Sequence, residues 1–258
     1  MTAAHWAPPG IRAGIAPRLP GERIAKPSEV TAAYAAALRR LSADPARTVV
    51  ARQVHGARVE TVDAETARSG LERGLVVHPG LTCDGLITAA PGVALGVVTA
   101  DCLPVLLADV KGRAVAAVHA GWRGLAAGIL KNAVARLLEG FQIPATDLRA
   151  YIGPAICKDC FETGPEVAAA MARLLGPAAL DLCSPGSGDR VHPDLKRLGR
   201  LSLAQAGLRE RDVCFSPDCT CCQNGIYWSH RRHGSARGNQ LNVIVLETEG
   251  LNGCDAHA

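Results

Sequence analysis

The sequence predicts an α/β or α+β protein with a large aliphatic core, and three observations support the two parts of this prediction. Short apolar runs of strand length alternate with helical segments, which is the pattern of mixed α/β proteins. Of the 258 residues, 48 % are apolar and 20 % are charged, which is enough to bury a large core. Aromatic residues make up only 3 %, so Ala, Val, Leu and Ile must fill that core. The length allows one large domain or two small ones, and no low-complexity linker or internal repeat marks a boundary between domains.

The expected strands are short apolar runs bounded by turn residues. Ala100 and Asp101 separate two of them, and a turn at Lys111–Gly112 precedes another. The Ser/Pro/Gly-rich segment 183–190 is expected to be a surface loop. The four clearest strands are expected at 92–98, 103–108, 114–118 and 242–246.

Helices are expected where a capping residue or a proline precedes apolar residues at helical spacing. Ser28 is the expected N-cap of a helix over Glu29–Leu41. Another helix is expected after Gly124 and to about residue 138, since apolar residues recur there every three to four positions. Prolines open the last two expected helices, at 165–175 and 193–206.

Charge and hydropathy exclude two classes of partner. A net charge of +4 is weak, and the sequence has neither a clustered basic face nor the aromatic residues that stack on nucleic-acid bases. Apolar runs such as Val93–Val98 are far shorter than the roughly 18 residues of a membrane span. The N-terminal residues include prolines and lack the apolar core of a signal peptide, so we expect a cytoplasmic protein. Its ten cysteines are then expected to be reduced thiols, some of them available to metals.

Three segments place a reactive side chain beside small or turn residues: Gln53–Gly56, Thr99–Pro104 and Val118–Gly124. Cys102 lies at the edge of one apolar strand, and His119 lies at the end of another, before glycines that permit a sharp turn. Strand ends that lead into helices are where α/β folds place their sites. The two residues are 17 positions apart, so we expect them on neighbouring strands.

His55, Cys102 and His119 match a three-ligand zinc site. Three protein ligands leave the fourth tetrahedral position open for water, which is the arrangement of catalytic zinc. Taken one at a time, each residue has a simpler interpretation, because a lone cysteine is usually a small buried hydrophobe and a lone histidine is usually only hydrogen-bonded. The spacing alone leaves both interpretations open.

The second and third segments closely resemble the two signature motifs of the laccase-domain family. Its members also carry the names multicopper polyphenol oxidase and purine nucleoside phosphorylase-like protein, and its bacterial members include the peptidoglycan editing factor. The resemblance covers about residues 50–246 and is specific, because at least six segments match in order. The further matches are Gln53–Gly56, Tyr151–Pro154, Phe161–Glu162, Cys219–Thr220, Ser229 with Arg231–Arg232, and Arg237.

The resemblance implies that His55, Cys102 and His119 hold zinc, with copper as the alternative metal. It also implies a single domain with two mixed sheets between helix layers. The implied activities are phosphorolysis of adenosine, inosine and S-methyl-5'-thioadenosine and hydrolytic deamination of adenosine, with nucleoside and phosphate as partners. The oxidase name fits the residues less well, because type-1 copper has a weak axial Met or a similar ligand. Neither Met1 nor Met171 lies near the trio of His55, Cys102 and His119 in sequence.

The sequence departs from the family pattern in three places. The segment 61–80 is expected to be an enlarged loop, and segment 10–18 only loosely resembles the opening strand of the family. His230 stands where many members have Tyr, beside the two arginines. These departures leave the substrate contacts near His230 open.

Four arginines are candidate phosphate ligands. Arg123 lies at the start of a helix, where backbone N–H groups favour an anion. Arg231, Arg232 and Arg237 cluster near the C-terminus, and guanidinium groups suit phosphate, although a solvated basic turn is the alternative. Asp101, directly before the cysteine ligand, is expected to orient a ligand histidine, to move a proton or to serve only as a turn residue.

A second set of cysteines leaves a second metal open. Cys157 and Cys160 form a C-x-x-C pair, and Cys219, Cys221 and Cys222 cluster downstream. We interpret the downstream cluster as C-x-C or C-C, which is an irregular spacing for a zinc site with four cysteines.

Two other functions stay open beside the zinc enzyme. A metal-free cysteine hydrolase would use Cys102 as nucleophile and His119 or His55 as base, and would cleave an amide in a peptidoglycan precursor. A non-catalytic binding or redox module would turn over neither substrate class. The residues leave the oligomeric state open.

Overall fold

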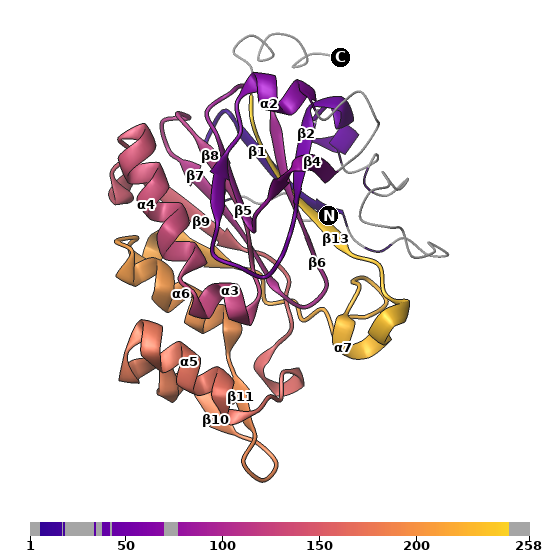
Figure 1. Ribbon diagram of the computed structural model, residues 1–258, viewed down its shortest axis with the longest axis vertical. Coiled ribbons are helices and arrows are strands. Elements are labelled where there is room, and N and C mark those ends of the chain that lie inside the picture. The colour runs from indigo at the N-terminus through magenta and orange to yellow at the C-terminus, as the bar shows by residue number, and fades with distance from the viewer. Residues whose placement is uncertain are drawn as a thin grey trace, which may run out of the picture.

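Two mixed β-sheets packed face to face form the centre of the structure (Figure 1). The computed structural model describes residues 6–16, 18, 34, 38–41, 43–69 and 77–247. The expected fold class is confirmed in these residues, which form a mixed α/β domain with two large mixed sheets and helices. Within the same ranges, no helix has the length and hydropathy needed to cross a membrane.

The six-stranded sheet contains the two strands expected beside Cys102 and His119. Its central strands β7 (Leu103–Asp109) and β8 (Val115–Ala120) are neighbours, as expected from the sequence, and the structure shows that they pair antiparallel. The sheet order is β12 (Val213–Phe215), β9 (Leu148–Ile152), β7, β8, β5 (Gly85–Thr88) and β3 (Val59–Thr61). The outermost pairs, β12 with β9 and β3 with β5, are parallel.

The five-stranded sheet carries the remaining long strands. Its order is β1 (Ile11–Ala16), β13 (Gln240–Leu246), β6 (Ala94–Thr99), β2 (Thr48–Arg52) and β4 (Val77–Thr82). β13 is antiparallel to both β1 and β6, whereas β2 is parallel to β6 and β4. β6 and β13 confirm the strands expected near 92–98 and 242–246, each with slightly shifted bounds.

β7 is buried on both faces, which explains why its sequence is a continuous apolar run. Leu103, Val105 and Leu107 face the cluster that includes the helices, whereas Leu106 and Ala108 face the five-stranded sheet. Successive side chains of a strand point to opposite faces, so a strand between two apolar layers needs apolar residues at every position.

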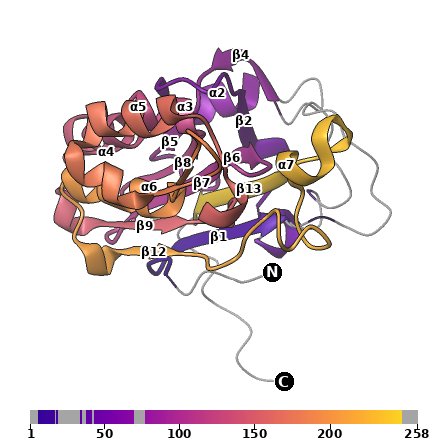
Figure 2. The ribbon, with the colours of Figure 1, turned by 90° about the horizontal axis from the view of Figure 1, so that it is seen from below.

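Helices cover the outer face of the six-stranded sheet (Figure 2). The helix expected after Gly124 is in fact two helices, α3 (Trp122–Ala126) and α4 (Ile129–Phe141), because Gly128 between them has a left-handed φ of 86°. The expected helix 165–175 is confirmed as α5 (Pro165–Leu175). The short elements elsewhere are α7 (His230–His233) and the 3-10 turns η1 (Pro45–Arg47), η3 (Ala145–Asp147), η4 (Lys158–Cys160), η5 (Pro177–Leu182), η6 (Glu210–Asp212) and η7 (Gly234–Ala236).

The last expected helix begins later than its proline suggested. α6 spans Leu195–Gln205, and Pro193 is the final residue of strand β11 (Val191–Pro193). Asp194 caps the helix, because its side chain accepts a hydrogen bond from the backbone N–H of Arg197. The boundary is therefore set by an N-cap carboxylate rather than by a proline in the first turn.

Two segments expected to be loops contain regular structure. Segment 183–190 belongs to a hairpin in which β10 (Cys183–Pro185) pairs with β11. Segment 61–80 holds the helix α2 (Ala64–Ser69) and the start of β4, with residues 70–76 outside the described ranges. The first expectation holds for residues 186–190 but was wrong for residues 183–185, and the second was wrong for α2 and β4, because polar and small residues also occupy short strands and exposed helices.

The expected helix over Glu29–Leu41 falls largely outside the described residues, as does its proposed cap Ser28. Tyr34 and Leu38 are helical and buried, and they pack with Val50 and Val243 of the five-stranded sheet. The outer face of this sheet is therefore also covered by helical residues.

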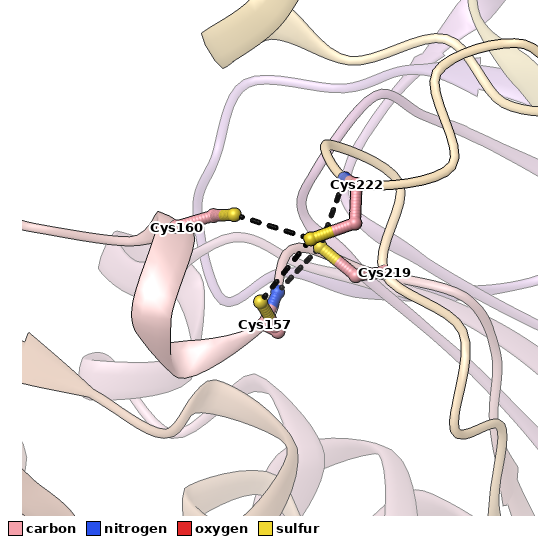
Figure 3. Close-up of side chains that lie close together, drawn as sticks. All are labelled: Cys157, Cys160, Cys219 and Cys222. Carbon is pink, nitrogen blue, oxygen red and sulfur yellow. Dashed lines mark hydrogen bonds between the residues drawn. The ribbon is translucent and has the colours of Figure 1, made fainter.

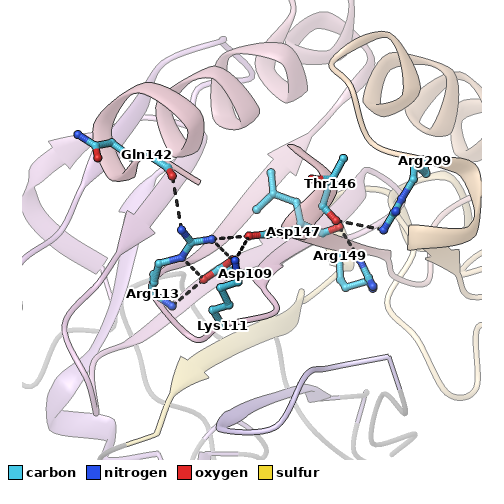
Figure 4. Close-up of polar contacts among 9 residues, drawn as sticks. Asp109, Lys111, Arg113, Gln142, Thr146, Asp147, Arg149 and Arg209 are labelled. Carbon is cyan, nitrogen blue, oxygen red and sulfur yellow. Dashed lines mark hydrogen bonds and ion pairs between the residues drawn. The ribbon is translucent and has the colours of Figure 1, made fainter. Parts of the chain in front are cut away.

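An ion-pair network closes the end of β7 that is far from Cys102 (Figure 4). Asp109 is fully buried and accepts hydrogen bonds from Nε and Nη2 of Arg113 at 2.7 and 2.8 Å. Arg113 also pairs with Asp147 at 2.9 Å. A strand of this length puts the network about 20 Å from Cys102, so it stabilises the sheet end and takes no part in the site.

Candidate metal centre and active-site cavity

The three expected metal ligands converge on one point, although they come from different parts of the chain. His55 lies in the loop between β2 and β3, Cys102 directly precedes β7, and His119 lies in β8. Their ligand atoms all lie within 4.8 Å of one another, and Cys102 Sγ is 3.9 Å from His55 Nε2. The two imidazole rings meet edge to face, with centroids 4.7 Å apart. His119 is buried and His55 is exposed, so the trio is accessible from one side.

Asp84, which the sequence reasoning missed, orients the buried histidine. Its Oδ1 lies 2.8 Å from Nδ1 of His119, and both residues are almost fully buried. Because the carboxylate accepts from Nδ1, the Nε2 atom is left for a metal ion. The only sequence signal was an acidic residue directly before an apolar strand, which is too common to identify a site.

The same carboxylate holds the loop that carries His55. It accepts hydrogen bonds from the backbone N–H groups of Val54, His55 and Gly56 at 3.1, 2.9 and 2.8 Å. These bonds stabilise His55 in the left-handed region, with φ of 60°, which is uncommon for a residue with a side chain. Asp84 thus positions two of the three ligands at once.

Two glycines of the third motif are needed for close approach rather than for the expected sharp turn. Gly121 has an ordinary φ of −63°, but a Cβ there would lie 2.8 Å from Cδ2 of His55 and 3.2 Å from Sγ of Cys102. A Cβ on Gly124 would lie 2.7 Å from the carbonyl oxygen of Gly56. A side chain at either position would push the His55 loop away from β8.

Cys102 and His119 form a mutually charged pair when no metal is bound. Burial by itself would raise the pKa of the Cys102 thiol, but hydrogen bonds from His119 and His55 outweigh it and lower the pKa to about 6. Burial would lower the pKa of His119, but its hydrogen bonds with Asp84 and Cys102 raise that pKa to about 9. At neutral pH the site therefore holds a thiolate, which is the form that binds zinc and also the form that attacks as a nucleophile.

The trio forms one wall of a cavity of about 850 Å³. This volume suits a ligand of drug or nucleoside size. The other walls come from the end of β6, the start of α3, the loop after β9 and the segment around α7. Besides His55, Cys102 and His119, the lining includes Asp101, Trp122, Arg123, Phe161, Arg231 and Arg237.

Three of the four candidate phosphate ligands line this cavity, and Arg232 does not. Arg123 stacks on Trp122, with its guanidinium carbon 4.4 Å from the ring centroid. Arg237 keeps a buried Nε atom for which the described residues supply no hydrogen-bond partner. Arg231 is held by backbone, since its guanidinium donates to the carbonyl oxygens of Cys160 and Glu162 at 2.9 and 3.1 Å.

The hydrogen bonds of the Asp101 carboxylate go to other residues than the two histidines, and it is Asp84 that orients His119. The Asp101 carboxylate accepts from Oγ1 of Thr220 at 2.6 Å and from the backbone N–H of Arg231 at 2.7 Å. Asp101 is buried, lines the cavity and has a φ of 94°, so it also serves as the turn residue. These two hydrogen bonds hold Thr220 and the backbone of Arg231 against the turn before β7.

Four of the five cysteines in the second set form a cluster, and it is not the grouping expected from their spacing. The structure brings Cys157, Cys160, Cys219 and Cys222 together and leaves Cys221 out. Cys219 and Cys222 are themselves a C-x-x-C pair, with Cys221 as one of the middle residues. The interpretation of the downstream cluster as C-x-C or C-C was therefore wrong.

Comparison with known proteins finds relatives of both the sequence and the fold. The chain is 32 % identical over 198 residues to "Adenosine deaminase RL5" from an unknown prokaryotic organism, covering 76 % of this chain and 74 % of that protein. It is 39 % identical over 215 residues to "Purine nucleoside phosphorylase SCO2081" of Streptomyces coelicolor, covering 80 % and 78 %. The crystal structure of YlmD from Geobacillus stearothermophilus matches with a TM-score of 0.83 at 27 % identity, covering 93 % of each chain.

The family model described as "Multi-copper polyphenol oxidoreductase laccase" matches residues 22–247. That span includes the metal trio, Asp84 and all the arginines of the cavity. The resemblance seen in the sequence motifs is thereby confirmed, and the chain belongs to the multi-copper polyphenol oxidoreductase laccase family.

Proposed function

We propose that this protein is a zinc-dependent purine nucleoside enzyme. It would act by phosphorolysis of adenosine, inosine and S-methyl-5'-thioadenosine and by hydrolytic deamination of adenosine. The observation that carries the proposal is a three-ligand site on a cavity whose other walls present arginine side chains. The names of the relatives support the same substrate class.

The residues of the trio fit zinc better than copper. Two imidazoles and one thiolate suit zinc, and the bond from Asp84 to His119 is the usual support of a ligand histidine. A type-1 copper site has a weak axial ligand such as methionine, but Met171 is fully buried in the core with α5. Zinc held by the trio would supply a Lewis acid and an activated water near neutral pH.

Arg237 supports an anion as the second substrate. Its side chain lines the cavity, and a guanidinium group suits the oxygens of a phosphate. Arg123 lies on the same cavity and its stacking on Trp122 restrains the guanidinium plane. A hydrolase alone has no need of two arginines here, whereas phosphorolysis needs a phosphate site.

The remaining walls suit a purine base. Trp122 and Phe161 present aromatic surface to the cavity, and bases stack on such surfaces. During turnover Asp84 would keep the Nδ1 proton of His119 and hold the ring in place. Asp101 would hold Arg231 and its neighbours at the rim through the backbone.

A cysteine-type amidohydrolase is the second candidate, and one observation favours it. Cys102, His119 and Asp84 form a chain of thiolate, imidazole and carboxylate, which is the arrangement of an activated cysteine nucleophile. In that mechanism Cys102 would attack the amide carbon of a peptidoglycan precursor and His119 would protonate the leaving amine. Both mechanisms use the same residues, so the metal requirement distinguishes them.

Product analysis with adenosine tests the proposal. We expect inosine without phosphate, and adenine together with ribose 1-phosphate when phosphate is present. Both activities should be lost when zinc is removed and should return when zinc is restored. Full activity of zinc-free protein on an amide substrate, with no turnover of adenosine under either condition, would overturn the proposal and leave the amidohydrolase.

A further inference from the structure

Two loops that are far apart in the sequence meet through four cysteines outside the cavity (Figure 3). Cys157 and Cys160 lie in the loop between β9 and α5, and Cys219 and Cys222 lie in the loop between β12 and α7. The Sγ atoms all lie within 4.8 Å of one another. Cys222 Sγ is 3.5 Å from Cys160 Sγ and 4.0 Å from Cys157 Sγ.

These separations match a tetrahedral metal site and do not match a disulfide. Zinc–sulfur bonds of about 2.3 Å in a tetrahedron put the sulfur atoms about 3.8 Å apart. A disulfide requires about 2.05 Å, which is far below the 3.5 Å between Cys160 and Cys222, and all four residues are free cysteines. The four thiols thus leave room for one ion at their centre.

The backbone around the cluster also suits thiolates. The N–H groups of Cys157 and Cys222 both donate to Sγ of Cys219, at 3.2 and 3.4 Å. Donors of this kind stabilise a negatively charged sulfur and orient it as a ligand. The buried ammonium of Lys196 donates to the carbonyl oxygens of Ser216 and Asp218 in the same loop, so a positive charge lies close by.

We propose that Cys157, Cys160, Cys219 and Cys222 form a structural zinc site, distinct from the His55–Cys102–His119 site. Its four ligands come from two C-x-x-C pairs, the usual pattern of structural zinc. All four tetrahedral positions are taken by protein, so this zinc holds loops together and activates no water. The inference does not depend on which reaction the cavity performs.

A zinc ion at this site would stabilise the part of the cavity wall that contains Asp101 and Arg231. Thr220, between two of the ligands, bonds Asp101 through its hydroxyl and Ala155 through its backbone N–H at 3.3 Å. Arg231 donates to the carbonyl oxygen of Cys160. Zinc would therefore fix the partners that hold Asp101 and Arg231, and its loss would loosen that side of the cavity.

Counting zinc in purified variants tests the site, and Cys221 supplies the matched control. Wild-type protein should carry two zinc ions per chain, and Cys222→Ser should carry one. Cys221→Ser changes the neighbouring thiol, which is not in the cluster, and should keep both ions. The proposal would be overturned if wild type and Cys222→Ser had the same zinc content, whether one ion per chain or two.

X-ray absorption at the zinc edge keeps the test decisive if Cys222→Ser does not fold. The single zinc left in His119→Ala should have four sulfur neighbours at about 2.3 Å, and wild type should average about 2.5 sulfurs per zinc. A His119→Ala protein without zinc, or with the four thiols joined as disulfides, would refute the site. Two zinc ions in a protein that does not turn over nucleosides would leave this inference standing and would refute only the proposed activity.

Discussion

Replacing Asp84 with Asn tests how far this carboxylate controls the metal ligands. The amide has the same shape, so it still lies between His119 and the backbone N–H groups of the His55 loop. It has no charge and only one acceptor oxygen, so the bond to Nδ1 of His119 weakens. Loss of such support for a ligand histidine typically lowers metal affinity about 10- to 100-fold, which corresponds to about 1.4–2.7 kcal/mol.

The same substitution should reduce stability. Asp84 is 1 % exposed and accepts four hydrogen bonds, three from backbone N–H groups and one from imidazole. A hydrogen bond to a charged group contributes about 1.5–3 kcal/mol. We therefore expect the free energy of unfolding to fall by about 2 kcal/mol, measured by denaturant titration.

Alkylation of Cys102 reports zinc binding at this site alone. A zinc-bound thiolate resists iodoacetamide, so the labelling of Cys102, read by peptide mapping against buffered free zinc, gives the affinity of the trio. Asp109→Asn is the control, because Asp109 is equally buried but binds Arg113 at the far end of β7. It should lose stability and keep the zinc affinity. If Asp84→Asn protects Cys102 at the same free zinc as wild type does, Asp84 does not orient the ligand.

Three further predictions concern Arg237, Gly121 and the pH dependence of Cys102 labelling. Arg237→Ala should raise the apparent phosphate constant about tenfold or more, whereas Arg232→Ala, outside the cavity, should not change it; equal effects in initial-rate measurements would place the phosphate elsewhere. Gly121→Ala puts a Cβ 2.8 Å from Cδ2 of His55 and should abolish zinc binding by His55, Cys102 and His119, measured by the same Cys102 labelling assay. Gly140→Ala, in open space within α4, should bind zinc normally and gain about 0.5–1 kcal/mol in denaturant unfolding, so zinc loss in both variants would point to misfolding instead. In zinc-free protein the labelling rate of Cys102 should rise with pH, reach half its plateau near pH 6 and be flat by pH 8; a midpoint near the ordinary value of about 8.5 would show that the histidines do not stabilise the thiolate.

Local sequence patterns predicted the elements whose own residues carry the signal. The apolar runs at β7 and β8 are long enough for a strand and are bounded by turns, and α5 begins with a proline and has a regular apolar face. The approach of Cys102 to His119 followed from the same information, because two strands joined by a short turn pair with each other. Patterns of this kind fail for the hairpin of β10 and β11, where polar residues occupy short strands.

The supports of the site could not be predicted from local patterns, because each joins segments that only the two packed sheets bring together. Asp84 reaches 29 residues back to the His55 backbone and 35 residues forward to His119, and nothing in its immediate neighbourhood indicates either partner. Asp101 binds the backbone of Arg231 across 130 residues.

The sequence by itself predicted the fold class and the family, and through the family resemblance it indicated His55, Cys102 and His119 as candidate metal ligands, because the motifs consist of residues close together in the chain. Only the tertiary structure decided which arginine faces the cavity, since Arg232 and Arg237 are alike in chemistry and differ in the direction that α7 and its following turn give them. It also decided that Cys222 rather than Cys221 joins Cys160, because the loop after β12 presents alternate side chains to different neighbours. Direction and long-range proximity are properties of the packed chain, and a residue's own neighbours in sequence carry no record of them.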